Sequence, residues 1–137
     1  MDRNQMRAAL LGRPKQFKRR MVTVRMAEGE EPVEVEVRQP TIRERSEIGR
    51  QCVQVIEQGG RTATAVDGFK LRLRSVLVCC YVPGTDERIF EDADLENLAG
   101  YPSGCYVDEL AETALELQNL SDAEDAGKNS KATPDAS

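Results

Sequence analysis

The sequence predicts a helix-dominated α+β domain, in which an N-terminal antiparallel β-hairpin precedes about four helices and a disordered C-terminal tail. Two observations carry this prediction. Apolar residues alternate with period two up to about residue 38, and they recur at helical spacing after Pro40-Thr41. The segment 69–82, FKLRLRSVLVCCYV, is the longest apolar run of the 137-residue chain, and its length favours a central helix over a buried strand. We therefore expect a basic arm or helix over 1–15, one domain over 16–120 and a disordered acidic, polar tail over 121–137.

The predicted hairpin covers residues 16–38, with its turn at Glu28-Gly29-Glu30. A lone hairpin is barely stable in water, so its apolar face must be covered by the helices. The outward face should carry complementary cross-strand charges, with Arg19 and Arg25 opposite Glu34 and Glu36. The inward face is predicted to consist of Val22, Val24, Met26, Val33, Val35 and Val37.

Helices are predicted over the rest of the domain. Thr41 followed by Glu44 is a capping box, and we expect this helix to run to about Gln58, where Gly59-Gly60 end it. Residues 61–66 then form a linker. A short helix capped by Asp92 and a last helix over about 104–120 complete the prediction.

The central helix over 69–82, with Asp67 as its N-cap, has two apolar stripes. The first stripe should face the core: Phe69, Leu73, Val76, Leu77 and Cys80. The second consists of Leu71, Val78 and Val82. Either neighbours cover both stripes, or the second stripe is a partner-binding surface, and we take these three residues as the candidate site.

Charge is unevenly spread along a chain whose net charge is −5. Residues 1–26 carry eight Lys and Arg against Asp2 alone, whereas residues 84–137 carry fourteen Asp and Glu. Such a dipolar chain favours head-to-tail self-association or a charged partner, although ordinary solvated faces would also explain it. The basic segment could contact phosphates, but without interleaved aromatic residues a charged hairpin edge is the favoured interpretation.

The composition argues against catalysis. The chain has no histidine and no C-x-x-C pair, so the commonest metal ligand and the usual Ser-His or Cys-His nucleophile pairs are missing. Asp92-x-Asp94-x-Glu96 lacks the glycine and the final glutamate of a calcium loop. We expect no cofactor, no metal and no enzymatic activity, with the four cysteines as reduced, largely buried thiols. The lack of a long apolar run or leader predicts a cytoplasmic protein with no membrane partner.

Several motifs resemble the tail assembly chaperones of long-tailed bacteriophages and related prophages. The resemblance covers about residues 33–121, through VRQPTIRERSEI, PGTDERIF with its acidic cap, and LAG followed by VDELA. It implies a small, self-associating helper that binds the tape-measure protein, brings tail-tube subunits to it and is absent from the mature virion. It also implies a longer form made by a −1 frameshift, for which Gly127-Lys128-Asn129 is a candidate position.

Two other classes remain open at this point. A structural virion protein, such as a head–tail connector, should be richer in strand and persist in particles. A small nucleic-acid-binding regulator would use residues 1–26 and bind DNA with a steep salt dependence.

Overall fold

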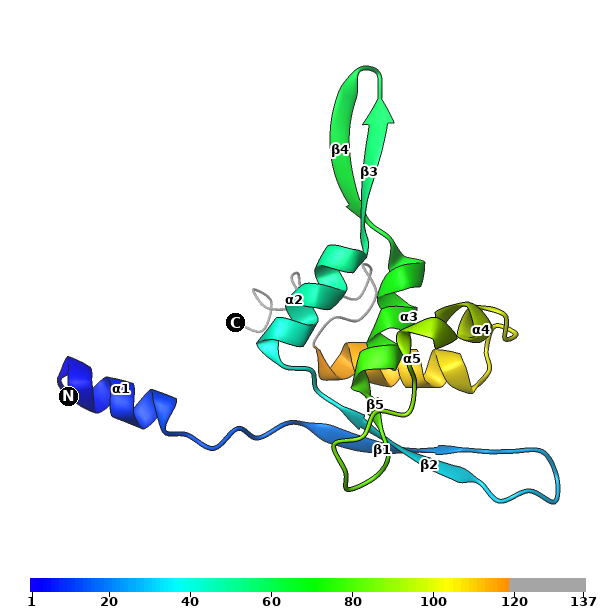
Figure 1. Ribbon diagram of the computed structural model, residues 1–137, viewed down its shortest axis with the longest axis horizontal. Coiled ribbons are helices and arrows are strands. Elements are labelled where there is room, and N and C mark those ends of the chain that lie inside the picture. The colour runs from blue at the N-terminus through cyan, green and yellow to red at the C-terminus, as the bar shows by residue number, and fades with distance from the viewer. Residues whose placement is uncertain (119–137) are drawn as a thin grey trace, which may run out of the picture.

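The computed structural model describes residues 1–118 and has an α+β fold (Figure 1). The predicted disordered tail and the candidate frameshift position lie outside the described residues. The elements are α1 (Arg3–Leu11), β1 (Arg19–Val24), β2 (Val33–Arg38), α2 (Ile42–Gln51), β3 (Val53–Gln58), β4 (Arg61–Val66), α3 (Gly68–Cys79), β5 (Cys80–Tyr81), the 3₁₀ turn η1 (Asp92–Asp94), α4 (Leu95–Ala99) and α5 (Tyr106–Leu117).

The predicted N-terminal hairpin is confirmed. Strands β1 and β2 pair antiparallel with Val22 opposite Val35, and β5 adds a third strand to give the order β1-β2-β5. The alternating valines Val22, Val24, Val35 and Val37 are buried, in one core with α3, α4 and α5. The predicted apolar face is not buried at the turn end of the hairpin. There Met26 and Val33 lie beyond the covering helices and are exposed.

One side of the hairpin was predicted wrongly. Glu36 was expected on a solvent-facing surface, but Glu36 and Arg38, which lies on the same side of β2, are only 5% and 8% exposed. The loop after β5 folds over this side, and the backbone N–H of Gly84 donates to Glu36 Oε1 at 3.1 Å. The predicted Arg19–Glu36 ion pair does form, with 3.5 Å between Nη1 and Oε2.

The central helix is confirmed as α3, with the Asp67 side chain accepting from Lys70 N at its N-cap. It packs mainly against α5 and also touches α2 and α4. Leu73, Val76 and Leu77 are buried as predicted. Phe69 is not, since it lies in the first turn with 56% of its surface exposed. The helix ends at Cys79, so Cys80 and Tyr81 are strand residues.

The helix predicted from Thr41 to about Gln58 is correct only in its first part. Thr41 and Glu44 form the predicted capping box, with bonds of 3.0 and 2.9 Å, and Ile48 is buried. Beyond Gln51 the prediction is wrong, because residues 53–58 form β3 and the predicted linker 61–66 forms β4. The reason lies in Gly59-Gly60, whose φ angles of 57° and 77° make a tight turn between two strands.

The last two helices are close to prediction. A 3₁₀ turn leads into α4, with Glu91 rather than Asp92 at the cap position. The final helix α5 starts at Tyr106, two residues later than predicted, because Cys105 occupies the N-cap and its sulfur accepts from Val107 N. All four cysteines are free thiols, and Cys52, Cys79 and Cys80 are buried.

Candidate partner-binding surfaces

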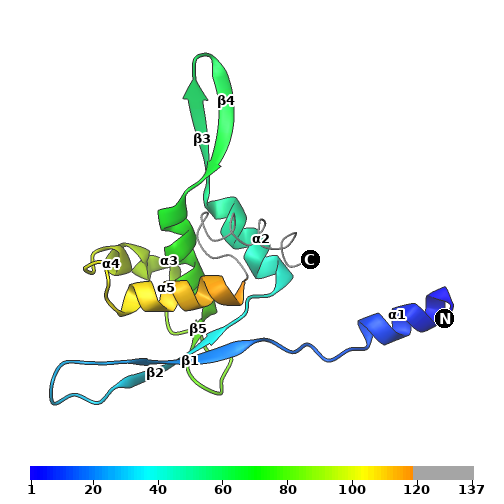
Figure 2. The same cartoon turned by 180° about the vertical axis from the view of Figure 1, so that it is seen from behind.

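The finger, defined as β3 and β4 (residues 53–66), is an exposed strand pair of the described chain. It projects away from the helices in both ribbon views (Figures 1 and 2). Its six paired positions run from Val53↔Val66 at the root to Gln58↔Arg61 at the tip. Every residue of the finger except Ala65 is exposed, so within residues 1–118 the finger has no apolar cover.

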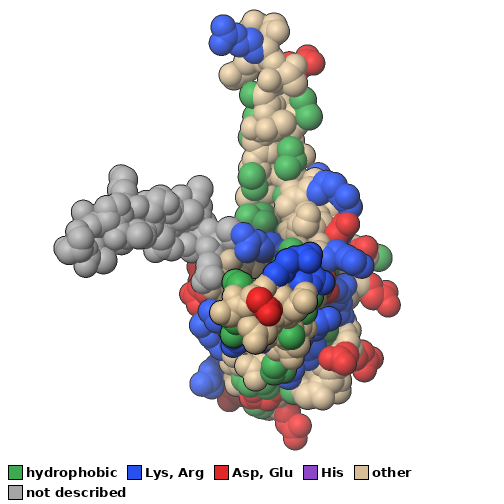
Figure 3. Space-filling model, turned by 90° about the vertical axis from the view of Figure 1, so that its left-hand side faces the viewer, with side chains coloured by type: hydrophobic (Ala, Val, Ile, Leu, Met, Phe, Trp, Pro, Cys, Tyr) green, Lys and Arg blue, Asp and Glu red, His purple; other side chains and the backbone are tan. Residues whose placement is uncertain are grey.

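One side of the finger carries its three valines. Because residues opposite each other across a strand pair share a face, Val53, Val66 and Val55 lie together. Their exposed fractions are 48%, 65% and 67%. Figure 3 shows hydrophobic side chains along the projecting element, with charged side chains at its end. An unsupported two-stranded hairpin is marginal in water, and its outer edges carry unpaired backbone groups, which makes it suited to receiving a partner.

Hydrogen bonds fix the root of the finger to the ends of α2 and α3. Asp67 N donates to Cys52 O at 2.6 Å, which closes the chain between α2 and α3. The side chain of Gln54 donates from Nε2 to Asp67 Oδ2 at 2.8 Å, while Asp67 also caps α3. These hydrogen bonds therefore fix the position of the finger's root relative to α2 and α3, although these helices do not cover the finger.

A second apolar surface is the groove, defined by Val24, Met26, Val33, Ile89, Tyr101 and Tyr106. It lies between the far end of the first hairpin and the segments around α4 and α5, and it encloses about 400 Å³. Tyr101 and Tyr106 stack edge to face with ring centroids 5.2 Å apart. Burial, and then the neighbouring Tyr101, raise the pKa of Tyr106 to about 12.

A partly buried ion cluster holds the loop after β5 against the first hairpin. Arg38 donates to Glu36 Oε2, Asp86 Oδ1 and the carbonyl of Thr85 at 2.9, 2.9 and 2.7 Å. Its guanidinium carbon lies 4.0 Å from the centre of the Tyr81 ring. Burial alone would raise the pKa of Glu36, but the Gly84 N–H and the cations Arg38 and Arg19 outweigh burial and hold this pKa below its usual value.

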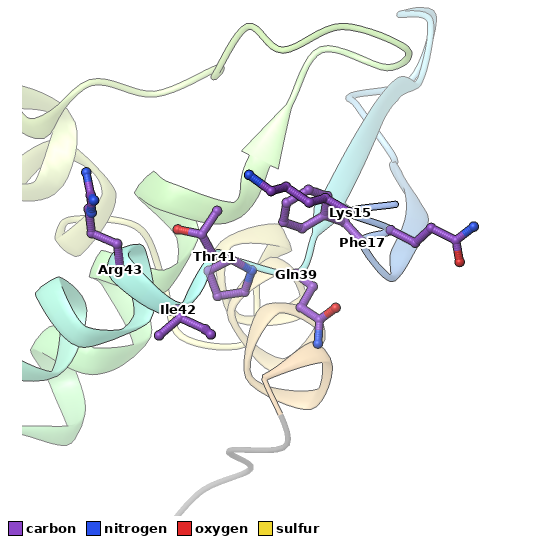
Figure 4. A pocket seen from close by; sticks show the side chains of 8 residues that line it. Lys15, Phe17, Gln39, Thr41, Ile42 and Arg43 are labelled. Atoms are coloured by element: carbon purple, nitrogen blue, oxygen red, sulfur yellow. The ribbon is translucent and has the colours of Figure 1, made fainter. Parts of the chain in front are cut away.

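A hollow of about 650 Å³ lies where the N-terminal arm meets the start of α2. Figure 4 shows Lys15 and Phe17 on the arm side and Thr41, Ile42 and Arg43 on the helix side. Ile42 is 91% exposed and Phe17 is half-buried. The hollow is wide and has few convergent polar groups, which argues against a small-molecule site.

The candidate residues Leu71, Val78 and Val82 do not form one helical stripe. Leu71 and Val78 lie two turns apart on α3, and both are half-buried. Val82 follows β5, where its backbone N–H donates to Glu87 O, and its side chain is 39% exposed. The residues that sequence reasoning missed are those of the finger, and the Gly59-Gly60 pair between two alternating runs was the signal that could have found them.

Groups for metal or thiol chemistry are not assembled in the part of the chain that the structure describes. No cluster of three or more Cys, Asp and Glu is placed there to hold a metal ion. Burial raises the pKa of Cys79 to about 12 and raises that of Cys80 further above the usual range, so these thiols stay protonated. Among residues 1–118, no helix is long and apolar enough to cross a bilayer.

Comparisons with protein-family models, with curated proteins and with solved structures found no match.

Proposed function

We propose that this chain is a non-enzymatic tail assembly chaperone of a long-tailed bacteriophage or prophage. In this proposal it acts in the cytoplasm of the bacterial host and is absent from the mature virion. It binds the tape-measure protein, keeps it soluble and brings tail-tube subunits to it, without a cofactor. The finger is the surface we assign to the tape-measure protein.

The observation that carries the proposal is the free, apolar finger. A hairpin that exposes Val53, Val55 and Val66 is stabilised when a partner covers this face or pairs with its open edges. The named partner comes from the resemblance of residues 33–121 to tail assembly chaperones. A tape-measure protein that must be kept soluble is a partner with apolar surface to cover.

Of the three residues that the sequence analysis took as the candidate site, only Leu71 lies close to the finger in sequence. Leu71 lies in the first turn of α3, five residues after the end of the finger at Val66. We assign Leu71 to the edge of the same partner-binding surface, whereas Val78 and Val82 lie at the other end of the helix and beyond it. They would contact a partner only if it extends along α3.

Co-expression with the tape-measure gene of the same locus tests the proposal. We expect the wild-type chain to increase the soluble fraction of the tape-measure protein, and Val55→Asp to abolish this increase. Gln58→Asp is the matched control, because it adds the same charge to the same exposed strand on the face opposite to the three valines. A wild-type chain that leaves the tape-measure protein insoluble would contradict the function, and equal activity of both variants would contradict the role of the finger.

A nucleic-acid-binding function is favoured by one specific observation. All nine residues of α1 are exposed, and Arg3 and Arg7 lie on it, with Arg13 and Lys15 following in the extended segment. Binding of the purified chain to DNA, with an affinity that falls steeply as salt rises, would favour this alternative. A virion protein is the other alternative, and detection of the chain in purified particles would support it.

A further inference from the structure

The N-terminal arm, defined as residues 1–18, begins with the helix α1, which the described part of the chain (residues 1–118) leaves uncovered. α1 has a complete capping box, in which Asp2 and Gln5 bond each other's backbone N–H groups at 2.8 and 2.9 Å. Nevertheless, isolated helices of this length are marginal in water even with good caps. A helix that stays exposed along its whole length therefore gains stability by docking on another surface.

The arm helix has an apolar face suited to docking. Met6, Ala9 and Leu10 are three and four residues apart, so their side chains share one side of α1. Met6 is 48% and Leu10 65% exposed, and Arg3 and Arg7 lie beside them. The docking surface that fits this helix is apolar and carries acidic residues at its border.

The groove has both properties. Its walls Met26, Val33, Ile89 and Tyr101 are all at least 36% exposed, so the groove is open to an incoming helix. The turn of the first hairpin borders it and carries three exposed glutamates, Glu28, Glu30 and Glu31. The glutamates outnumber Arg25, the cation that lines the groove.

The arm and the groove of one chain lie at opposite ends of the molecule. In Figures 1 and 2, α1 lies at one end of the first hairpin and the turn of that hairpin lies at the other. Residues 12–18 would have to reverse and run back along all of β1 for α1 to reach its own groove, whereas the groove of a second copy is reached without refolding. A helix-into-groove contact between copies is heterologous, so it can repeat from chain to chain.

We propose that α1 of one copy docks in the groove of another copy, with Met6 and Leu10 against its apolar walls and Arg3 and Arg7 facing Glu28, Glu30 and Glu31. This inference does not rest on the proposed function, because it concerns the purified chain alone. It gives the basic N-terminal segment a physical role, since the basic arm of one copy meets the acidic hairpin turn of the next.

Sedimentation velocity over a wide concentration range tests the docking. The wild-type chain should form oligomers that grow with concentration. Leu10→Asp on the arm, or Val33→Asp on the groove, should each weaken association by about tenfold or more, as loss of an interface anchor does. Ala8→Asp is the matched control, because it puts the same charge on the opposite face of α1 and should leave association unchanged.

Mixing the two variants makes the test specific. The Leu10→Asp chain keeps an intact groove and the Val33→Asp chain keeps an intact arm, so a mixture should form one-to-one dimers and nothing larger. A monomeric wild-type chain, a mixture without dimers, or an Ala8→Asp chain as weak as Leu10→Asp would each overturn the proposal.

A charge exchange keeps the proposal testable if either aspartate variant is less stable. Arg3→Glu with Arg7→Glu should weaken association, as should Glu30→Lys with Glu31→Lys, and all four changes in one chain should restore it. These positions are exposed, so the fold should tolerate the changes. Failure of the fourfold variant to recover association would overturn the pairing of arm and hairpin turn.

Discussion

The two β-hairpins described in this chain have strands of equal length, yet one is buried by neighbouring elements and the other is exposed to solvent. The first, β1–β2, buries Val37 completely, whereas in the second, β3–β4, Val55 is 67% exposed. The difference comes from the helices, because α3 and α5 cover one side of β1–β2 and the Glu36–Arg38 cluster fixes the loop on the other. Alternation therefore specifies a strand, and the neighbouring elements decide whether the strand belongs to the core.

The largest contrast should come from placing a charge at the buried hairpin. Val37→Asp puts a carboxylate at a fully buried position between the strands and α5, so we expect a loss of more than about 4 kcal/mol in the free energy of unfolding. Chemical denaturation measures this loss. A well-folded Val37→Asp chain of near wild-type stability would break the distinction between the two hairpins.

A cavity under the first hairpin should have the next largest effect. Leu110 of α5 is fully buried in the core that contains the hairpin valines. Leu110→Ala removes apolar contacts and leaves a void, and it should cost about 2–5 kcal/mol. The midpoint of urea unfolding reports this cost, and a change below about 0.5 kcal/mol would show that the covering helix packs loosely.

The ion cluster should contribute a smaller, pH-dependent amount. Glu36→Gln removes the buried carboxylate that accepts from Arg38 and Gly84, at a cost of about 1–3 kcal/mol at neutral pH. Because the pKa of Glu36 in the folded chain lies below its ordinary value of 4.5, its stabilisation is complete above that value and is lost as pH falls through the folded pKa. Melting temperatures of both chains as a function of pH should therefore converge in acid, and a constant difference would exclude the carboxylate charge as the cause.

The same substitution that destroys the first hairpin should be tolerated by the second. Val55→Asp lies on the exposed finger, so we expect a change within about 0.5 kcal/mol in the free energy of unfolding. Thermal melting of the purified variant measures it, with Val37→Asp as the internal comparison. A strong loss of stability would show that the finger is covered in the free chain.

The sequence predicted the first hairpin, the Thr41 capping box and the core face of α3 because each depends on local spacing that few alternatives satisfy. It did not predict the finger. The period-two run VQVIEQ was assigned to the end of a helix because Ile48, Cys52, Val55 and Ile56 also fit helical spacing. The Gly59-Gly60 turn should have outweighed that fit, since two consecutive positive φ angles close a hairpin and do not simply end a helix.

Long-range contacts limited the rest of the prediction. Glu36 and Arg38 alternate as solvent-facing residues should, and their burial depends on a loop that follows more than forty residues later. Likewise the groove joins the hairpin end to Ile89, Tyr101 and Tyr106, which are distant in sequence. Neither surface could be assembled from local patterns, because no periodicity records which loop covers which face.

Native-state hydrogen exchange of the backbone amides tests the contrast between the hairpins most directly. The amides of β2 that bond to β1 and β5 should exchange only with global unfolding, because the core must open to expose them. The amides paired within the finger should exchange through local opening at a free energy near zero in the free chain, and should become protected when the tape-measure protein is added. Finger amides as slow as those of β2 in the free chain would contradict the account, because they would show that the finger is already covered.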